Sequence, residues 1–188
     1  ILADNMGAIN VLYSVPINEG RGVYLVQSLD EGNTWSTPHT VFDAPAAGWE
    51  VVGEVQFVIS QPGGYYVLVM RRSFQGEDQD QGAYLGLYYT YSFDGGRNWS
   101  PLELVDAGVV TWGQISQDGN GRLYRIWQVE IQGEPQIRYQ SSHDAGVTWE
   151  PAETLSSFGE SLRFTRMVPD QAGQIHLLQI VRDSTTRL

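Results

Sequence analysis

The chain contains no cysteine among its 188 residues, so disulfide bonds and thiolate metal sites are excluded. This absence does not fix the compartment, because cytosolic proteins and bacterial secreted proteins can both lack cysteine. Basic residues are scarce: lysine plus arginine total 11, against 22 aspartates and glutamates, which gives a net charge of −11. A surface this acidic argues against nucleic acid and anionic membranes as partners, since both are bound through basic side chains.

Long apolar runs and helical periodicity are missing as well. The longest apolar stretches have the length of a β-strand, so we expect no transmembrane span. No segment repeats its apolar residues at the period of an amphipathic helix. The chain begins at Ile1 with no visible signal peptide, and we expect it to be an internal piece of a longer protein.

What the sequence does contain is the motif Ser-x-Asp-x-Gly-x-x-Trp, which occurs three times and is followed each time by a proline. Each copy lies between two strand-like runs and therefore predicts a hairpin turn. The aspartate accepts backbone hydrogen bonds, the glycine supplies a positive φ, and the tryptophan pins the turn against the sheet. We expect these residues to be structural: Ser28, Asp30, Gly32, Trp35, Ser92, Asp94, Gly96, Trp99, Ser142, Asp144, Gly146 and Trp149.

A second set of turn signals precedes each motif, at residues 4–7, 61–64 and 118–121, and recurs at 170–173. One unit then reads strand, tight turn, strand, loop, strand, Asp turn, strand, which is a four-stranded antiparallel meander and the blade of a β-propeller. We predict an all-β partial propeller of about three and a half blades, forming one domain over 1–188. The expected pieces are most of one blade at 1–45, whole blades at 46–108 and 109–160, and the first half of a blade at 161–188.

With these motifs the chain resembles the sialidase superfamily, whose repeat is called the Asp box or BNR repeat. The resemblance implies a six-bladed propeller in the parent protein and a glycan or glycoconjugate as partner. It also implies that the remaining blades of the parent are partners of this piece, and it favours a secreted or cell-surface bacterial protein. We expect no cofactor and no metal.

The resemblance also implies site residues. Sialidases carry a glutamate on an inner strand, a turn glycine, an arginine at the end of the next strand, and then an Asp box. By this match Glu54 resembles the catalytic glutamate, and Arg71, or Arg72 if the register slips by one, resembles an arginine that binds the sialic acid carboxylate. Tyrosine is the nucleophile in such enzymes, and a neighbouring glutamate takes its proton.

Two departures from that pattern stand out. Phe164 lies where the nucleophilic tyrosine is expected, and the stretch from Glu130 to Pro135 lacks the arginine expected before the third box. One hypothesis is therefore a glycan-directed Asp-box propeller with an incomplete catalytic set. The alternative is an active exo-sialidase-type glycoside hydrolase with Glu54 as base and Arg71 as carboxylate clamp, so whether the protein is an enzyme stays open.

The remaining candidates have plain structural readings. Trp49, Trp112 and Trp127 are sugar-stacking candidates for which core packing is the simpler expectation. The histidines are scattered and suggest no metal cluster. The acidic stretch at 77–80 lacks the spacing of a calcium loop, and we expect it to be solvated.

Overall fold

The computed structural model describes residues 1–60, 63–74, 83–157, 162–170 and 172–181, so the acidic stretch at 77–80 lies outside the described residues. Every regular element in these ranges is a β-strand. Accordingly, no helix capable of spanning a membrane occurs in the described part of the chain. The prediction of an all-β fold is confirmed.

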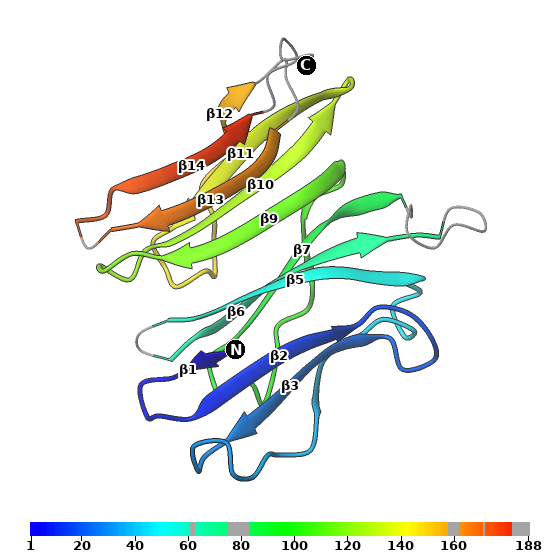
Figure 1. Ribbon diagram of the computed structural model, residues 1–188, viewed down its shortest axis with the longest axis vertical. Helices are drawn as coiled ribbons and strands as arrows, with labels where there is room; N and C mark the ends of the chain where they lie inside the picture. Colours follow the sequence, from blue (N-terminus) through cyan, green and yellow to red (C-terminus); the bar gives the residue numbers. More distant parts are fainter. Residues whose placement is uncertain (61–62, 75–82, 158–161, 171, 182–188) are drawn as a thin grey trace, which may run out of the picture. The chain divides into compact units, whose positions relative to one another are not determined.

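The strands form antiparallel sheets in which each strand pairs with its neighbours in sequence (Figure 1). This confirms the predicted four-stranded antiparallel meander. The first sheet contains β1 (Leu2–Ala3), β2 (Ile9–Val15), β3 (Gly22–Ser28) and β4 (His39–Asp43); the second contains β5 (Val51–Ile59), β6 (Tyr65–Arg72), β7 (Tyr84–Ser92) and β8 (Glu103–Asp106). The third contains β9 (Val109–Gln117), β10 (Leu123–Ile131), β11 (Glu134–Ser142) and β12 (Glu153–Ser157), and β13 (Leu162–Pro169) pairs with β14 (Ile175–Val181).

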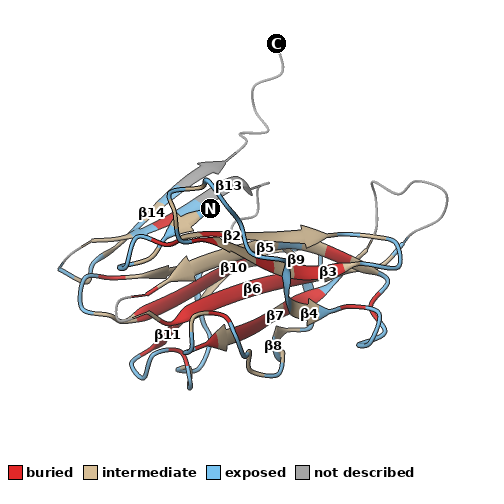
Figure 2. Ribbon diagram, turned by 90° about the horizontal axis from the view of Figure 1, so that it is seen from below, coloured by how far each residue is buried: buried red, intermediate tan, exposed pale blue. Residues whose placement is uncertain are grey.

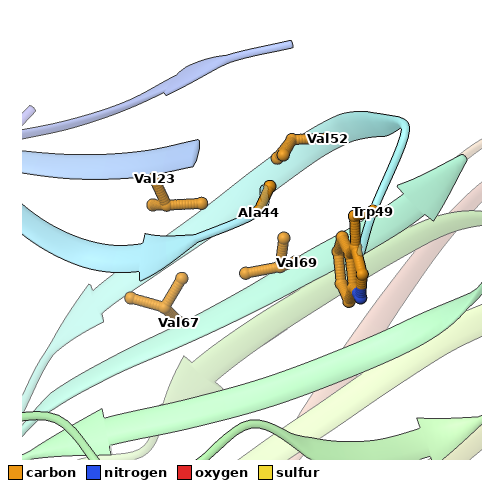
Figure 3. Close-up of a cluster of buried hydrophobic side chains, with 6 residues drawn as sticks. All are labelled: Val23, Ala44, Trp49, Val52, Val67 and Val69. Carbon is orange, nitrogen blue, oxygen red and sulfur yellow. The ribbon is translucent and has the colours of Figure 1, made fainter. Parts of the chain in front are cut away.

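The chain divides into two compact units, residues 1–107 and 108–188. The first unit holds the sheets β1–β4 and β5–β8, and their facing sides form its core. Figure 3 shows Val67 and Val69 of β6 directed toward Val23 and Ala44, with Val52 and Trp49 completing the cluster. Alternate residues of a strand lie on the same face, so β6 presents one row of side chains to this core.

The second unit packs the β13–β14 hairpin against the sheet β9–β12. Met167 of β13 lies in a buried cluster with Tyr124, Ile126 and Ile137. A polar clamp accompanies the apolar contact: the Gln114 amide donates to the Met167 carbonyl at 2.6 Å and accepts from its N–H at 3.0 Å. The backbone of β13 is therefore tied to β9 as well as packed against β10.

Burial is concentrated in the middle strands of the sheets, as Figure 2 shows for β6 and β10. The last strands, β4 and β8, are mostly exposed or half-buried. Strands that are buried on both faces read as continuous apolar runs, which explains the sequence YYVLVM in β6. The chemistry of the sheets is thus expected at strand ends and in loops rather than on the faces of β6 and β10.

The turn between the first two strands of each sheet is built in the same way four times. An oxygen of the first turn residue accepts backbone N–H groups from later residues of the turn, as with Asp118 Oδ1 and the N–H groups of Asn120 and Arg122, both at 2.9 Å. The residue six positions after it adds a side-chain contact in three turns. These pairs are Ser60 with Tyr66, Asp118 with Tyr124, and Asp170 with His176.

The first strands of three sheets are also irregular at one shared place. In β5 the pairing with β6 shifts between Val52 and Val55, and in β13 the pairing with β14 shifts between Leu162 and Phe164. In β9 the pairing shifts at the residues opposite Gln128 and Val129 of β10. A bulge of this kind bends the strand and redirects side chains, and bulges occur often beside active sites. Glu54 lies in the irregular stretch of β5.

Candidate functional site

The three Asp boxes share one hydrogen-bond pattern. In the first, Ser28 Oγ donates to Asp30 Oδ1 and accepts the Gly32 N–H, both at 2.8 Å. Asp30 then accepts the Thr34 N–H at 2.8 Å and the Thr34 hydroxyl at 2.6 Å. The boxes at Ser92 and Ser142 repeat these bonds, with Asn98 and Thr148 in place of Thr34. Each box is therefore closed by its own residues.

These hydrogen bonds stabilise the ionised aspartates. The pKa of Asp144 falls to about 2, chiefly because the Thr148 hydroxyl donates to its carboxylate. The pKa of Asp94 is lowered too, first by the Asn98 N–H, and that of Asp30 first by the Thr34 hydroxyl. The carboxylates are thus committed to closing turns, and a carboxylate held this firmly in its ionised form is a poor proton donor.

The first two boxes differ in what surrounds them. Trp35 is 45% exposed, whereas Trp99 is half-buried against the core of the first unit and lies 6.4 Å from the Tyr65 ring. Gly96 lies so close to Leu25 that an added Cβ would overlap the leucine side chain. At Gly32 the atom nearest to an added Cβ would be in the Trp35 ring, 3.8 Å away. The second box is therefore fitted to the sheet that precedes it, and the first has no such partner among the described residues.

Glu54, the glutamate implied by the family resemblance, lies in the bulge of β5 with an exposed side chain. It forms no hydrogen bond or ion pair with any described residue. Its carboxylate is therefore accessible, and the structure does not join it to Arg71 or Arg72.

Arg71 lies at the far end of β6 from the Asp box, on the face that carries Val67 and Val69. Its guanidinium lies over the Trp49 ring, 5.5 Å from the centroid. Its Nε is buried and has no hydrogen-bond partner among the described residues. A buried donor without a partner is uncommon and calls for an explanation.

Trp49 forms a rigid support for that arginine. It is 4% exposed, and its ring contacts Phe42 and Tyr88 with centroid distances of 4.6 and 4.7 Å. The Trp49 backbone N–H donates to the Ala44 carbonyl at 2.9 Å, and the Trp49 carbonyl accepts from Arg21 Nε at 2.5 Å. The ring is therefore part of the core of the first unit, and the Arg71 guanidinium lies over it.

Arg72 points away from Arg71, as the alternation of side chains along a strand requires. Its guanidinium lies over the Tyr84 ring at 4.8 Å, and its Cδ is next to Gly53. The two adjacent arginines therefore belong to different faces of one sheet and do not converge on one ligand.

Aligning the four hairpins on their shared turn shows which residues depart from the repeat. The pairs Ala3–Ile9, Ile59–Tyr65, Gln117–Leu123 and Pro169–Ile175 close equivalent turns. Six residues beyond, the four sheets carry Val15, Arg71, Val129 and Val181. Five residues before, the last three carry Glu54, Trp112 and Phe164. Arg71 and Glu54 are thus charged residues at positions that the other sheets fill with apolar ones.

The same alignment picks out Arg122, which the motifs alone did not flag. It immediately precedes β10, where the other three hairpins have Ala8, Gly64 and Gln174. The signal was present in the sequence, but it appears only when the hairpins are compared with one another instead of with the Asp boxes.

The remaining sequence candidates have clear places. The backbone of Phe164 lies in β13, paired with Ile180. The stretch from Glu130 to Pro135 is a tight hairpin turn with positive φ at Gln132 and Gly133, and it offers no loop that extends toward a ligand. Trp49 and Trp127 are buried, and Trp112 is half-buried against the core of the second unit. In the described residues, no three His, Asp or Glu side chains lie together as a metal ion would require.

Comparison with known proteins agrees with these repeats. The family model of the BNR/Asp-box repeat matches residues 90–101, which include the second box. No curated protein sequence matches the chain.

Solved structures match far more of the chain. A protein of unknown function from Dyadobacter fermentans DSM 18053 aligns over 97% of this chain and 61% of its own, with a TM-score of 0.71 and 15% identity. The Hadza microbial sialidase Hz136 aligns over 88% of this chain and 38% of its own, with a TM-score of 0.63 and 18% identity. An ulvan lyase of polysaccharide lyase family PL25, bound to -[GlcA(1-4)Rha3S]-, aligns over 97% and 49%, with a TM-score of 0.65 and 12% identity.

At these identities the likeness concerns the fold, and the chain spans less than two thirds of each of the three structures. These matches agree with the three boxes and the consecutive antiparallel sheets. The chain carries the BNR/Asp-box repeat on an all-β fold of the sialidase-like type.

Proposed function

We propose that the sheets are blades of an Asp-box β-propeller and that the protein binds acidic glycans at the strand ends opposite the boxes. In this proposal residues 1–45 form most of one blade, residues 46–108 and 109–160 form whole blades, and residues 161–188 form the first half of a blade. The ligand is a glycan with a terminal carboxylated sugar, and Arg71 binds its carboxylate.

The observation that carries the proposal is the environment of Arg71. A guanidinium replaces the valine of the other repeats, is held over a buried tryptophan, and keeps a buried Nε without a hydrogen-bond partner in the described residues. Burying such a group costs free energy unless a partner is supplied. Guanidinium geometry matches a carboxylate through two parallel hydrogen bonds, so an acidic sugar is the fitting partner.

The similar structures support the glycan class, because two of them are named as a sialidase and an ulvan lyase. Arg72 is the weaker candidate, since it lies on the opposite face over Tyr84. The incomplete catalytic set expected from Phe164 and from the tight turn at Gln132–Gly133 favours binding over sialic acid cleavage.

Binding is tested by titrating the protein with N-acetylneuraminic acid and, as a neutral control, with galactose. The Arg71→Val variant restores the repeat residue and is expected to weaken acid-sugar binding about tenfold or more, the loss of a charge-assisted pair. Arg97→Gln, which removes an equal charge from an exposed box residue, should leave the affinity unchanged. Equal affinity in the Arg71→Val variant and the original protein would remove Arg71 from the site.

A second function, glycoside hydrolysis with Glu54 as base, is favoured by one observation: an exposed carboxylate without a partner among the described residues lies in a strand bulge. Release of a fluorophore from a sialoside by the protein, and its loss in Glu54→Gln, is the expected result for an enzyme. If the protein binds the acid sugar and does not hydrolyse the sialoside, the proposed hydrolase function is contradicted and the binding function remains.

A further inference from the structure

A recess of about 320 Å³ lies within the second unit, at the end of the sheet β9–β12 where the third Asp box is found. Its walls come from the β9–β10 turn, the start of β10, the box and the β13–β14 turn. The residues that line it include Asp118, Asn120, Arg122, Tyr124, His143 and Ala172. The volume is at the small end of the range typical of ligand pockets.

Arg122 is the main cation of this recess. Its guanidinium lies over the Tyr124 ring at 5.3 Å, and its Nη2 donates to Ser141 Oγ at 2.8 Å. Its Nε is buried and has no hydrogen-bond partner in the described residues. A guanidinium carries five N–H donors, so this side chain is fixed in place with much of its donor capacity unused by the described residues.

The recess also contains a carboxylate, which restricts what it accepts. Asp118 is 8% exposed, and it accepts the N–H groups of Asn120 and Arg122 through Oδ1 and the Tyr124 hydroxyl through Oδ2 at 3.1 Å. A carboxylate has about four acceptor positions, so one remains for a ligand donor. A polyanion without hydroxyl groups is repelled by the Asp118 carboxylate. A ligand that carries hydroxyl groups beside an acidic group can donate to Asp118 and bind Arg122 through the acidic group.

The residues that make the recess polar are departures from the repeat. Arg122 stands where the other hairpins have Ala8, Gly64 and Gln174. His143 stands where the other two boxes have Leu29 and Phe93. A cation and an imidazole thus appear together in the one sheet whose turn forms this recess.

We propose that this recess binds an acidic monosaccharide unit of the hexuronate type, at a site distinct from Arg71 and independent of the function proposed above. Arg122 receives the sugar carboxylate in a charge-assisted hydrogen bond. Asp118 accepts a ring hydroxyl, and the Asn120 amide and His143 imidazole are further hydrogen-bonding groups of the walls. The recess is therefore a second acid-sugar site at the Asp-box end of the strands.

The test is a titration followed by amide NMR shifts, with D-glucuronate as ligand, D-glucose as its neutral analogue and inorganic sulfate as a bare anion. D-glucuronate is expected to saturate shifts around Arg122 and His143, and neither control should do so. Arg122→Gln, which installs the residue of the fourth hairpin, and Ala172→Trp, which fills the recess and keeps the arginine, should each weaken binding about tenfold or more.

Arg97→Gln serves as the matched control, because it removes one charge from an exposed residue that does not line the recess and should leave these shifts intact. Unchanged affinity in both Arg122→Gln and Ala172→Trp, an absence of saturable shifts, or equal binding of sulfate would each overturn the proposal. Since the two sites are read by different variants and different shifts, failure here leaves the proposed role of Arg71 untouched.

Discussion

The sheets β5–β8 and β9–β12 are built to one plan and differ in chemistry. Both have a turn of the same length between their first strands, an irregularity at the same place, and an Asp box after their third strand. In the first of them the repeat is broken by Arg71, at the strand end away from the box. In the second it is broken by Arg122, at the box end, while Val129 occupies the place of Arg71. The arginines for which we propose ligand binding are therefore exceptions within the repeat, Arg71 at the strand end away from the box of its sheet and Arg122 at the box end of its own.

The largest effect is expected when an arginine is introduced into β10 at the position equivalent to Arg71. Val129→Arg places a guanidinium at a position that is 1% exposed. An uncompensated buried charge costs about 3–5 kcal/mol, so we expect a loss of this size in the free energy of unfolding, measured by urea denaturation. Val129→Met, of similar length and uncharged, should lose only about 1–3 kcal/mol from overpacking. Equal losses would mean that the position tolerates charge as β6 does.

The boxes provide the next test, because the first and second have the same hydrogen bonds and different surroundings. Gly96→Ala adds a Cβ that overlaps Leu25 and also strains a residue with φ of +82°. Left-handed backbone costs about 1–2 kcal/mol for alanine, and the overlap adds about 1–2 kcal/mol. Gly32→Ala, with φ of +90° and open space, should show the first loss alone in thermal unfolding. If both variants lose the same stability, the contact with Leu25 carries no weight.

Restoring the repeat in β6 has a smaller effect of opposite sign. Arg71→Val removes the buried Nε that lacks a partner and installs the residue found at 15, 129 and 181. We expect the free energy of unfolding to rise by about 1 kcal/mol, the usual size for an unsatisfied buried donor. Arg97→Val, which removes a charge from an exposed residue, is the control and should bring no such gain. A clear loss of stability in Arg71→Val would show that the arginine is structural.

The smallest expected effect is the acid response of the boxes. The folded pKa of Asp144 is about 2, below its ordinary value of 3.8, so its ionised form contributes stability that is complete above pH 4. This contribution is lost as the pH falls from about 4 toward 2, because the unfolded chain takes up the proton first. Asp144→Asn should flatten the decline of stability in that range, and a pH titration of the melting temperature measures it. An unaltered slope would contradict the assigned role of the carboxylate.

The sequence predicts the architecture well because its signals are local. Each box closes within eight residues, and each tight turn uses a first residue that accepts the N–H groups following it, so the spacing of Ser28, Asp30 and Gly32 is enough to place a turn. Alternating apolar residues between such turns define the strands. The hydrogen-bonded contact between Asp118 and Tyr124 is less evident, since it joins positions six apart across a hairpin.

The site depends on longer-range facts that local patterns do not contain. The bulge at Glu54 arises from the pairing of β5 with β6. The position of the Arg71 guanidinium depends on Trp49, a loop residue that precedes the sheet. The recess beside Arg122 needs the β13–β14 turn to approach the β9–β10 turn, where an added Cβ at Gly173 would lie 3.2 Å from Asp118 Oδ2. The sequence indicates which residues are candidates for a site, but which of them lie in contact depends on how the strands and sheets pack.

The Asp boxes also bear on the order in which the chain folds. All the hydrogen bonds that close a box join residues at most four positions apart, and each strand pairs with its immediate neighbour in sequence. Little chain entropy is lost before such contacts form, so a single meander can assemble early, before any second sheet is present. We expect the docking of finished sheets to be slower, because contacts such as that between Leu25 and Gly96 join residues far apart in sequence. The boxes and turns therefore belong to each sheet alone, whereas side chains that face a neighbouring sheet, such as Leu25, are matched to that neighbour.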